Sequence, residues 1–168
     1  MSSMALPINV CGIEPESIVD GPGFRYVVFV QGCPHHCPGC HNPQSHPFEG
    51  GTPRTAAELF AEFSQNPLLS GITLSGGEPF CQAEALCELA SLVKQAGKTV
   101  VAYSGYTLEQ LLEKAKDEPA ILRLLRLCDT LIDGPYIEQK RNLELLFRGS
   151  ENQRILDLNE WFGNHPQS

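Results

Sequence analysis

Short apolar runs alternate with amphipathic segments along most of this chain. Each run spans only a few residues and is followed by polar or turn-forming residues, a pattern typical of buried β-strands. The runs lie at residues 26–31, 71–74, 99–103, 130–133, 145–147 and 154–158. They predict a sheet built from several short strands.

Helical patterns fill the intervals between these runs. Two pairs of residues have capping-box spacing and predict helix starts: Thr55 with Glu58, and Thr107 with Gln110. Apolar residues at helical spacing predict a third helix over 86–93, which ends before Gly97. Pro119 suits the first turn of a fourth helix, which we expect to extend to Leu125.

Strands that alternate with helices indicate β/α units around a parallel sheet. The 168 residues fit one domain, residues 1–168, with a disordered tail expected at 162–168. They hold too few β/α units for a complete eight-stranded barrel, which needs about 250 residues. We therefore predict the α/β class and an open partial (β/α) barrel. A Gly- and Pro-rich stretch at 43–53 predicts a loop that could cover a site.

Composition narrows the choice of partners and compartment. The chain is 42% hydrophobic and 19% charged, with a formal net charge of -8. This acidic balance argues against nucleic acid, because phosphate binding needs a basic face. No apolar run reaches the roughly 20 residues of a transmembrane helix, and residues 1–7 lack the pattern of a leader peptide. We expect a cytoplasmic protein without a membrane partner.

Three of the seven cysteines lie in one loop directly after the run at 26–31. Cys33, Cys37 and Cys40 have C-x3-C-x2-C spacing, and no second motif of this kind occurs. Closed zinc sites and electron-transfer clusters normally have four protein ligands, so three ligands leave one metal position for a substrate or cofactor. The loop therefore predicts one iron–sulfur cluster whose fourth iron faces a pocket.

A zinc site is the alternative interpretation of this loop, since His35, His36 or His41 could supply a fourth ligand. Zinc gives no role to the adjacent strand or to the later Gly-Gly-Glu sequence, so we favour the cluster. We expect His35 and His36 to be solvated loop residues. The other cysteines are scattered, and metal binding plus buried thiols explains them better than disulfides do. We expect buried thiols at Cys81 and Cys87.

Several motifs occur together between Val19 and Leu156. They are Asp20-Gly-Pro-Gly-Phe-Arg25, the cysteine loop ending in His41-Asn42, Ser75-Gly-Gly-Glu-Pro79, Asp133-Gly-Pro135 and residues 148–154. In this combination and order the chain resembles the radical S-adenosylmethionine (SAM) enzymes, and among them the activases of glycyl radical enzymes. The resemblance implies an open partial barrel of the radical SAM type.

The resemblance also implies which residues form the site. Cys33, Cys37 and Cys40 would bind a single 4Fe-4S cluster. SAM contacts would come from two segments of the chain: Gly39, Cys40 and His41, and then Gly76, Gly77 and Glu78. Gly39 and His41 would contact the adenine, although Gly39 occupies a position where many radical SAM enzymes have an aromatic residue. The Gly-Gly-Glu sequence would contact the methionine end.

The implied reaction is reductive cleavage of SAM, which yields methionine and a 5'-deoxyadenosyl radical that removes a hydrogen atom from a glycine. The glycine would belong to a large partner, by resemblance anaerobic ribonucleoside-triphosphate reductase, and a flavodoxin-like protein would supply electrons. Three alternatives stay open. They are activation of another glycyl radical enzyme of the pyruvate formate-lyase type, a radical SAM enzyme acting on a small molecule, and a zinc-stabilised binding module.

Three polar segments have two interpretations each. Arg25 is either a surface residue after a Gly-Pro turn or a residue near the site. Residues 103–106 form either an ordinary strand-to-helix turn or a loop on the rim of the site. Residues 148–154, including Arg148 and Arg154, form either a solvated loop or an edge that helps dock the partner or bind SAM.

Overall fold

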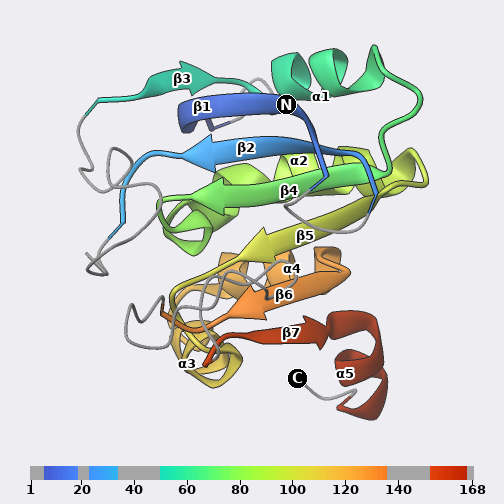
Figure 1. Ribbon diagram of the computed structural model, residues 1–168. Helices are drawn as coiled ribbons and strands as arrows, with labels where there is room; N and C mark the ends of the chain where they lie inside the picture. Colours follow the sequence, from blue (N-terminus) through green and yellow to red (C-terminus); the bar gives the residue numbers. More distant parts are fainter. Residues whose placement is uncertain (1–5, 19–22, 34–49, 136–151, 166–168) are drawn as a thin grey trace.

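The strands of this computed structural model form one mixed sheet (Figure 1), described here for residues 6–18, 23–33, 50–135 and 152–165. In these residues the strand order is β3-β1-β2-β4-β5-β6-β7. Four neighbouring strands are parallel: β2 (Arg25–Val30), β4 (Gly71–Gly76), β5 (Thr99–Tyr103) and β6 (Thr130–Asp133). The antiparallel strands lie outside them: β1 (Ile8–Ser17), β3 (Thr52–Arg54) and β7 (Arg154–Asp157).

The sheet is open, because β3 and β7 lie at opposite ends of the strand order within the described residues. Five α-helices accompany the sheet in the same part of the chain: α1 (Ala56–Ser64), α2 (Ala83–Gln95), α3 (Leu108–Lys114), α4 (Pro119–Leu127) and α5 (Leu158–Asn164). The α/β class and the open arrangement predicted for the chain are confirmed. A 3-10 turn, η3 (Pro79–Gln82), links β4 to α2.

The main core lies between one face of the sheet and the helices. Val28, Leu74, Ala102 and Leu131 lie side by side across the parallel strands and belong to this core. Figure 1 shows α2 and α4 behind the sheet. Since side chains alternate along a strand, Phe29, Ser75 and Tyr103 belong to the other face. The helix-covered face therefore holds the core, and the opposite face carries more polar residues.

Local signals start the helices as predicted. Thr55 and Thr107 both form complete capping boxes, with Glu58 and Gln110 as their partners. Pro119 occupies the first turn of α4, where its missing N–H costs no helical hydrogen bond. These caps fix the points at which α1, α3 and α4 leave the loops.

Three elements differ from the sequence prediction. Strand β1 was not expected, and its pairing with β2 contains register shifts near Gly12 and between Glu14 and Ser17. Strand β3 lies partly in the stretch 43–53 that was predicted as a loop. Helix α5 continues through Asn164, so its last turn replaces the first residues of the predicted tail. The strand predicted at 145–147 lies outside the described residues.

Among the described residues, no helix has both the length and the apolar composition that crossing a membrane would require.

Candidate functional site

The parallel strands β2, β4, β5 and β6 all end at the same edge of the sheet, and their arrowheads point to the left in Figure 1. This carboxyl edge is where ligands bind in open α/β sheets. Cys33 follows β2, the Gly-Gly-Glu turn follows β4, and Ser104 follows β5. The topology thus gathers motifs that are far apart in sequence.

The Gly-Gly-Glu turn lies against the start of the cysteine loop. The backbone N–H of Gly77 donates to the carbonyl of Val30 at 2.8 Å, and that of Glu78 donates to the carbonyl of Gly32 at 2.8 Å. Cys33 is the next residue after Gly32, and its side chain is buried. The two motifs predicted to share a site are therefore joined by backbone hydrogen bonds.

Glycine is required in this turn because the chain itself approaches closely. A Cβ atom on Gly77 would lie 2.2 Å from the Gly32 carbonyl oxygen. Gly76 has a φ of 95°, and a Cβ there would lie 2.5 Å from the Val30 nitrogen. The sequence suggested that these glycines admit a ligand. Among the described residues, they instead allow close packing against the backbone that leads to Cys33.

The Glu78 side chain is fully buried and accepts hydrogen bonds from two loops. Its Oε1 accepts the N–H of Gly105 at 2.8 Å, and its Oε2 accepts the Ser104 hydroxyl at 2.8 Å. The N–H of Phe80 also donates to Oε2, at 3.2 Å, which caps η3. Ser104 and Gly105 thus contact the Gly-Gly-Glu turn, which favours a loop on the rim of the site over an ordinary strand-to-helix turn. The sequence feature that indicated these two residues was the segment 103–106, which lies at the end of a predicted strand.

Tyr106 lies within electrostatic reach of this group. Partial burial, followed by the charges of Cys81, Glu78 and Cys33, raises the pKa of the Tyr106 phenol. The ammonium group of Lys114 lies 5.1 Å from the centre of the Tyr106 ring. The loop after β5 therefore contributes an aromatic side chain near the Gly-Gly-Glu turn, and the last residue of α3 places a cation over its ring.

The remaining predicted ligands lie outside the described residues: Cys37, Gly39, Cys40 and His41, together with His35 and His36. The described residues fit a cluster in their chemistry. Cys33 offers a thiolate ligand, and the turn 76–78, which carries the buried Glu78 carboxylate, is hydrogen-bonded to the residues just before it. These are groups that can hold an iron and the amino acid end of a ligand.

Arg25 has neither of the two roles considered for it. It is fully buried and lies at the start of β2, at the end of the sheet opposite to Cys33. Its guanidinium donates to the Thr73 and Thr99 hydroxyls and to the Ile72 and Thr99 carbonyls, at 2.7 to 3.0 Å. Burial lowers the pKa of Arg25 to about 10, and the charge of Asp129 partly opposes that shift. Arg25 clamps β2, β4 and β5 together, so both interpretations were wrong.

The described end of the segment 148–154 packs onto the carboxyl edge at β6. Arg154 donates to both carboxylate oxygens of Asp133, and its Nη2 lies 2.7 Å from Glu109. Hydrogen bonds to Asp133 and then to Glu109 raise the pKa of Arg154. Asp133 also caps α3 by accepting the Leu108 N–H at 2.7 Å. This part of the segment joins β7, β6 and α3, while Arg148 lies outside the described residues.

The other described cysteines have varied environments. Cys128 is buried, Cys11 and Cys87 are half-buried, and Cys81 is exposed, so the prediction of a buried thiol was wrong for Cys81. Cys81 lies in η3, where it remains partly desolvated. This desolvation, followed by the charges of Glu78 and Cys33, raises its pKa to about 11. A thiol with this pKa is a weak nucleophile at neutral pH.

Comparison with known proteins identifies the family. The model of a 4Fe-4S single cluster domain matches residues 19–156. The anaerobic ribonucleoside-triphosphate reductase-activating protein of Escherichia coli strain K12 is 32% identical over 153 residues, which cover 86% of this chain and 95% of that protein. The chain belongs to the anaerobic ribonucleoside-triphosphate reductase-activating proteins. The member of this family from Enterobacteria phage T4 is 35% identical over 155 residues, or 88% of this chain and 93% of that one.

A second kind of activating enzyme is also similar to this chain. The pyruvate formate-lyase-activating enzyme of Listeria monocytogenes is 33% identical over 169 aligned residues, which cover 95% of this chain but 65% of that enzyme. The predicted family, the activating-enzyme class and the cofactors, one 4Fe-4S cluster and SAM, are confirmed by these findings. The zinc-stabilised module gains no support from them.

Proposed function

We propose that this chain cleaves SAM reductively and places a glycyl radical on anaerobic ribonucleoside-triphosphate reductase. The observation that carries the proposal is the pair of backbone hydrogen bonds from Gly77 and Glu78 to Val30 and Gly32. They hold the Gly-Gly-Glu turn against the segment that leads into the cysteine loop. A bound 4Fe-4S cluster supplies the electron that splits the sulfonium. The protein supplies position and protection from water.

In this proposal Cys33, Cys37 and Cys40 would hold the cluster, and the iron left without a protein ligand would bind the amino acid end of SAM. Gly76, Gly77 and Glu78 bind the methionine end, and Gly39, Cys40 and His41 bind toward the adenine. The hydrogen bonds to Ser104, Gly105 and Phe80 keep the Glu78 carboxylate in one orientation. A fixed carboxylate and fixed peptide groups favour one pose of SAM, because no reorganisation is needed on binding.

The partner and the reductant are parts of the same proposal. The reductase supplies the target glycine, and a flavodoxin-like protein supplies electrons in the cytoplasm. An open sheet suits a polypeptide target, because a protruding loop can approach the carboxyl edge.

Anaerobic reconstitution with iron and sulfide tests the chemistry. We expect about four irons per chain, an electron paramagnetic resonance (EPR) signal of the reduced cluster that changes on addition of SAM, and 5'-deoxyadenosine formation with dithionite. Replacing Cys33, Cys37 or Cys40 by Ala should abolish both the change of signal and the product, whereas Cys11→Ala should preserve them. Stoichiometric zinc without iron, or a signal insensitive to SAM, would refute the proposal.

A second candidate is the activation of pyruvate formate-lyase, favoured by the 33% identity to the Listeria monocytogenes enzyme. Incubating the reduced holoprotein with each partner in turn separates the two candidates. A glycyl radical EPR signal on the reductase supports our proposal, and a signal on the lyase alone contradicts it. SAM turnover that depended on a small metabolite, without either protein, would instead indicate a small-molecule radical SAM enzyme.

A further inference from the structure

The peptide carbonyls of residues 30–32, directly before Cys33, each accept a hydrogen bond from the chain that follows β4. Those of the first and the third residue accept from backbone N–H groups of the turn 76–78, as described above. The carbonyl between them, that of Gln31, accepts from the Nε2 of Gln82 at 3.1 Å. A side chain thus completes the set of hydrogen bonds that holds the backbone leading into Cys33.

The same amide group also pairs with the backbone of β1. The Asn9 N–H donates to the Oε1 of Gln82 at 2.8 Å, and the Nε2 of Gln82 donates to the Asn9 carbonyl at 3.0 Å. That carbonyl also accepts the Gln31 N–H at 2.9 Å. The half-buried Gln82 amide therefore joins β1 to the end of β2 and uses both its donor and its acceptor.

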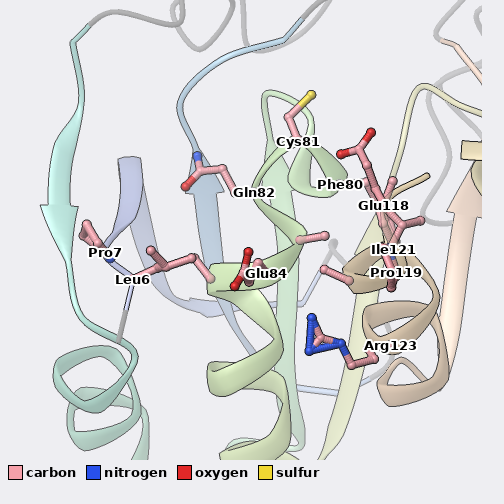
Figure 2. A pocket seen from close by; sticks show the side chains of 13 residues that line it. Leu6, Pro7, Phe80, Cys81, Gln82, Glu84, Glu118, Pro119, Ile121 and Arg123 are labelled. Carbon is pink, nitrogen blue, oxygen red and sulfur yellow. The ribbon is translucent and has the colours of Figure 1, made fainter. Parts of the chain in front are cut away.

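Gln82 lies directly before α2, but its side chain serves the strands. It forms no capping hydrogen bond with α2. Figure 2 shows the pocket at this point, with the Gln82 amide group extending away from the helix. Shorter side chains, such as those of Ser, Thr, Asp and Asn, are usual where a side chain caps a helix start. The hydrogen bonds to Asn9 and Gln31 therefore explain a glutamine here better than helix capping does.

The chain returns to the same point after residue 49. The Nδ2 of Asn9 donates to the Gly50 carbonyl at 2.9 Å. Gly51 has a φ of 77°, and a Cβ atom there would lie 2.7 Å from the Asn9 Oδ1 and 2.9 Å from the Gln31 Cβ. Gly50 and Gly51 therefore pack against the two residues that Gln82 joins.

We propose that Gln82 is a positioning residue for the iron–sulfur cluster, which acts through the Gln31 backbone on the nearby ligand Cys33. This inference rests on the function proposed above, in which Cys33 binds the cluster. Ordering a chain segment opposes binding, so a ligand whose backbone the fold already holds binds at a lower cost. Replacing residues that orient metal ligands typically changes metal affinity or activity about 10–100-fold. Gln82 needs no contact with iron or SAM for this role.

Two replacements of Gln82 test the inference. Gln82→Leu removes the hydrogen bonds to Asn9 and Gln31 at similar side-chain size, and Gln82→Glu keeps the acceptor but loses both donors. After anaerobic reconstitution, we expect iron release to an excess of the chelator bathophenanthroline disulfonate to be about tenfold faster in both variants than in the unaltered protein. The g values of the reduced cluster in EPR should also shift, because Cys33 would meet the cluster in a different orientation.

Two controls separate the position of Cys33 from general stability. Gln95→Leu alters an exposed glutamine at the end of α2, whose Nε2 donates to Ser91, and should leave iron release and EPR unchanged. Arg25→Lys breaks hydrogen bonds between strands at the opposite end of the sheet. It should lower the free energy of unfolding without shifting the g values. Circular dichroism checks that each variant is folded, and Gln82→Glu carries the test if Gln82→Leu does not fold.

The outcomes distinguish this inference from the proposed function. Unchanged iron release and g values in the folded Gln82 variants, while the unaltered protein cleaves SAM, overturn the positioning role and leave the proposed function intact. Equal changes in Arg25→Lys and the Gln82 variants also overturn it, because they would reflect lost stability alone. Failure of the unaltered protein to assemble a cluster or to cleave SAM instead overturns the proposed function.

Discussion

The Ser104 hydroxyl donates to the Glu78 carboxylate at 2.8 Å and connects the loops that follow β4 and β5. The Tyr106 N–H donates to the same hydroxyl at 3.0 Å, so the Ser104 proton is directed toward Glu78. Both side chains are buried. Ser104 is therefore a positioning residue, which acts on the Gly-Gly-Glu turn through the Glu78 carboxylate.

Replacing Ser104 by Ala should weaken SAM binding. The change removes a donor from a buried carboxylate, which costs about 1–3 kcal/mol when the acceptor stays unsatisfied. We expect the Kd for SAM to rise about tenfold, since about 1.4 kcal/mol corresponds to that factor. Titrating the EPR signal of the reduced cluster with SAM measures this Kd.

Two further variants show whether the effect is specific. Ser104→Thr keeps the hydroxyl and should restore much of the SAM affinity. Ser91→Ala removes a hydroxyl on α2 that accepts from Gln95 at an exposed position, and it should change nothing. Unaltered SAM affinity in Ser104→Ala would contradict the positioning role.

Replacing Gly77 by Ala should prevent proper assembly of the site. The new Cβ would lie 2.2 Å from the Gly32 carbonyl oxygen, which belongs to the backbone and can move away only by displacing the start of the cysteine loop. We expect a lower iron content after reconstitution, measured per chain by chemical analysis. Gly12→Ala is the control, because no atom lies within 4 Å of the Cβ it would introduce. Full iron content in Gly77→Ala would contradict this account.

Much of the fold could be predicted because its signals are local. The strands at 99–103 and 130–133 have the predicted bounds, and the two capping boxes begin α1 and α3 where expected. Each of these elements is specified by a few consecutive residues. Strand β1 was missed because Gly12 and Pro15 interrupt its apolar pattern. Only pairing with β2 and β3, which is non-local, makes this segment a strand.

The candidate site was predictable as a set of motifs but not as a set of contacts. The Gly-Gly-Glu turn could be placed after a strand from sequence, since the run at 71–74 precedes it directly. The bond between Ser104 and Glu78 depends on β4 and β5 being neighbours, which spacing does not specify. Arg25 illustrates the same limit. Its burial between β2, β4 and β5 follows from strand order, whereas a charged residue after a turn resembles a surface residue.

Arg25 should therefore matter for stability more than for chemistry. Arg25→Lys loses the planar set of donors that reaches Thr73, Thr99 and Ile72 together, and it leaves buried acceptors unsatisfied. We expect the free energy of unfolding to fall by about 3 kcal/mol or more. Urea unfolding followed by circular dichroism measures this change. The Kd for SAM in the folded fraction should stay unchanged, and a loss of SAM affinity at unaltered stability would place Arg25 in the site after all.

Acid should destabilise the protein partly through Asp129, which joins α2, β5 and α5. Its carboxylate accepts hydrogen bonds from Lys94 at 2.6 Å, Val100 N–H at 2.8 Å and Asn159 at 2.9 Å. Burial alone would raise the pKa of Asp129, but these hydrogen bonds outweigh it and hold the pKa below the ordinary value of 3.8. A pKa lowered by folding means that the ionised form stabilises the native state.

This stabilisation is complete above the unfolded-state pKa, which is about 3.9 for an aspartate, and it is lost as the pH falls through the lower pKa of the folded state. Asp129→Asn should reduce the free energy of unfolding by about 1–3 kcal/mol at pH 7 and flatten its decline in acid. Asp117→Asn, at an exposed position, should keep the steeper decline of the unaltered protein. Urea titrations between pH 7 and the acid limit of solubility measure both curves. Lys94 of α2 and Asn159 of α5 stabilise the ionised form of Asp129. If the stability of the two variants fell equally with acid, other carboxylates would account for the acid sensitivity.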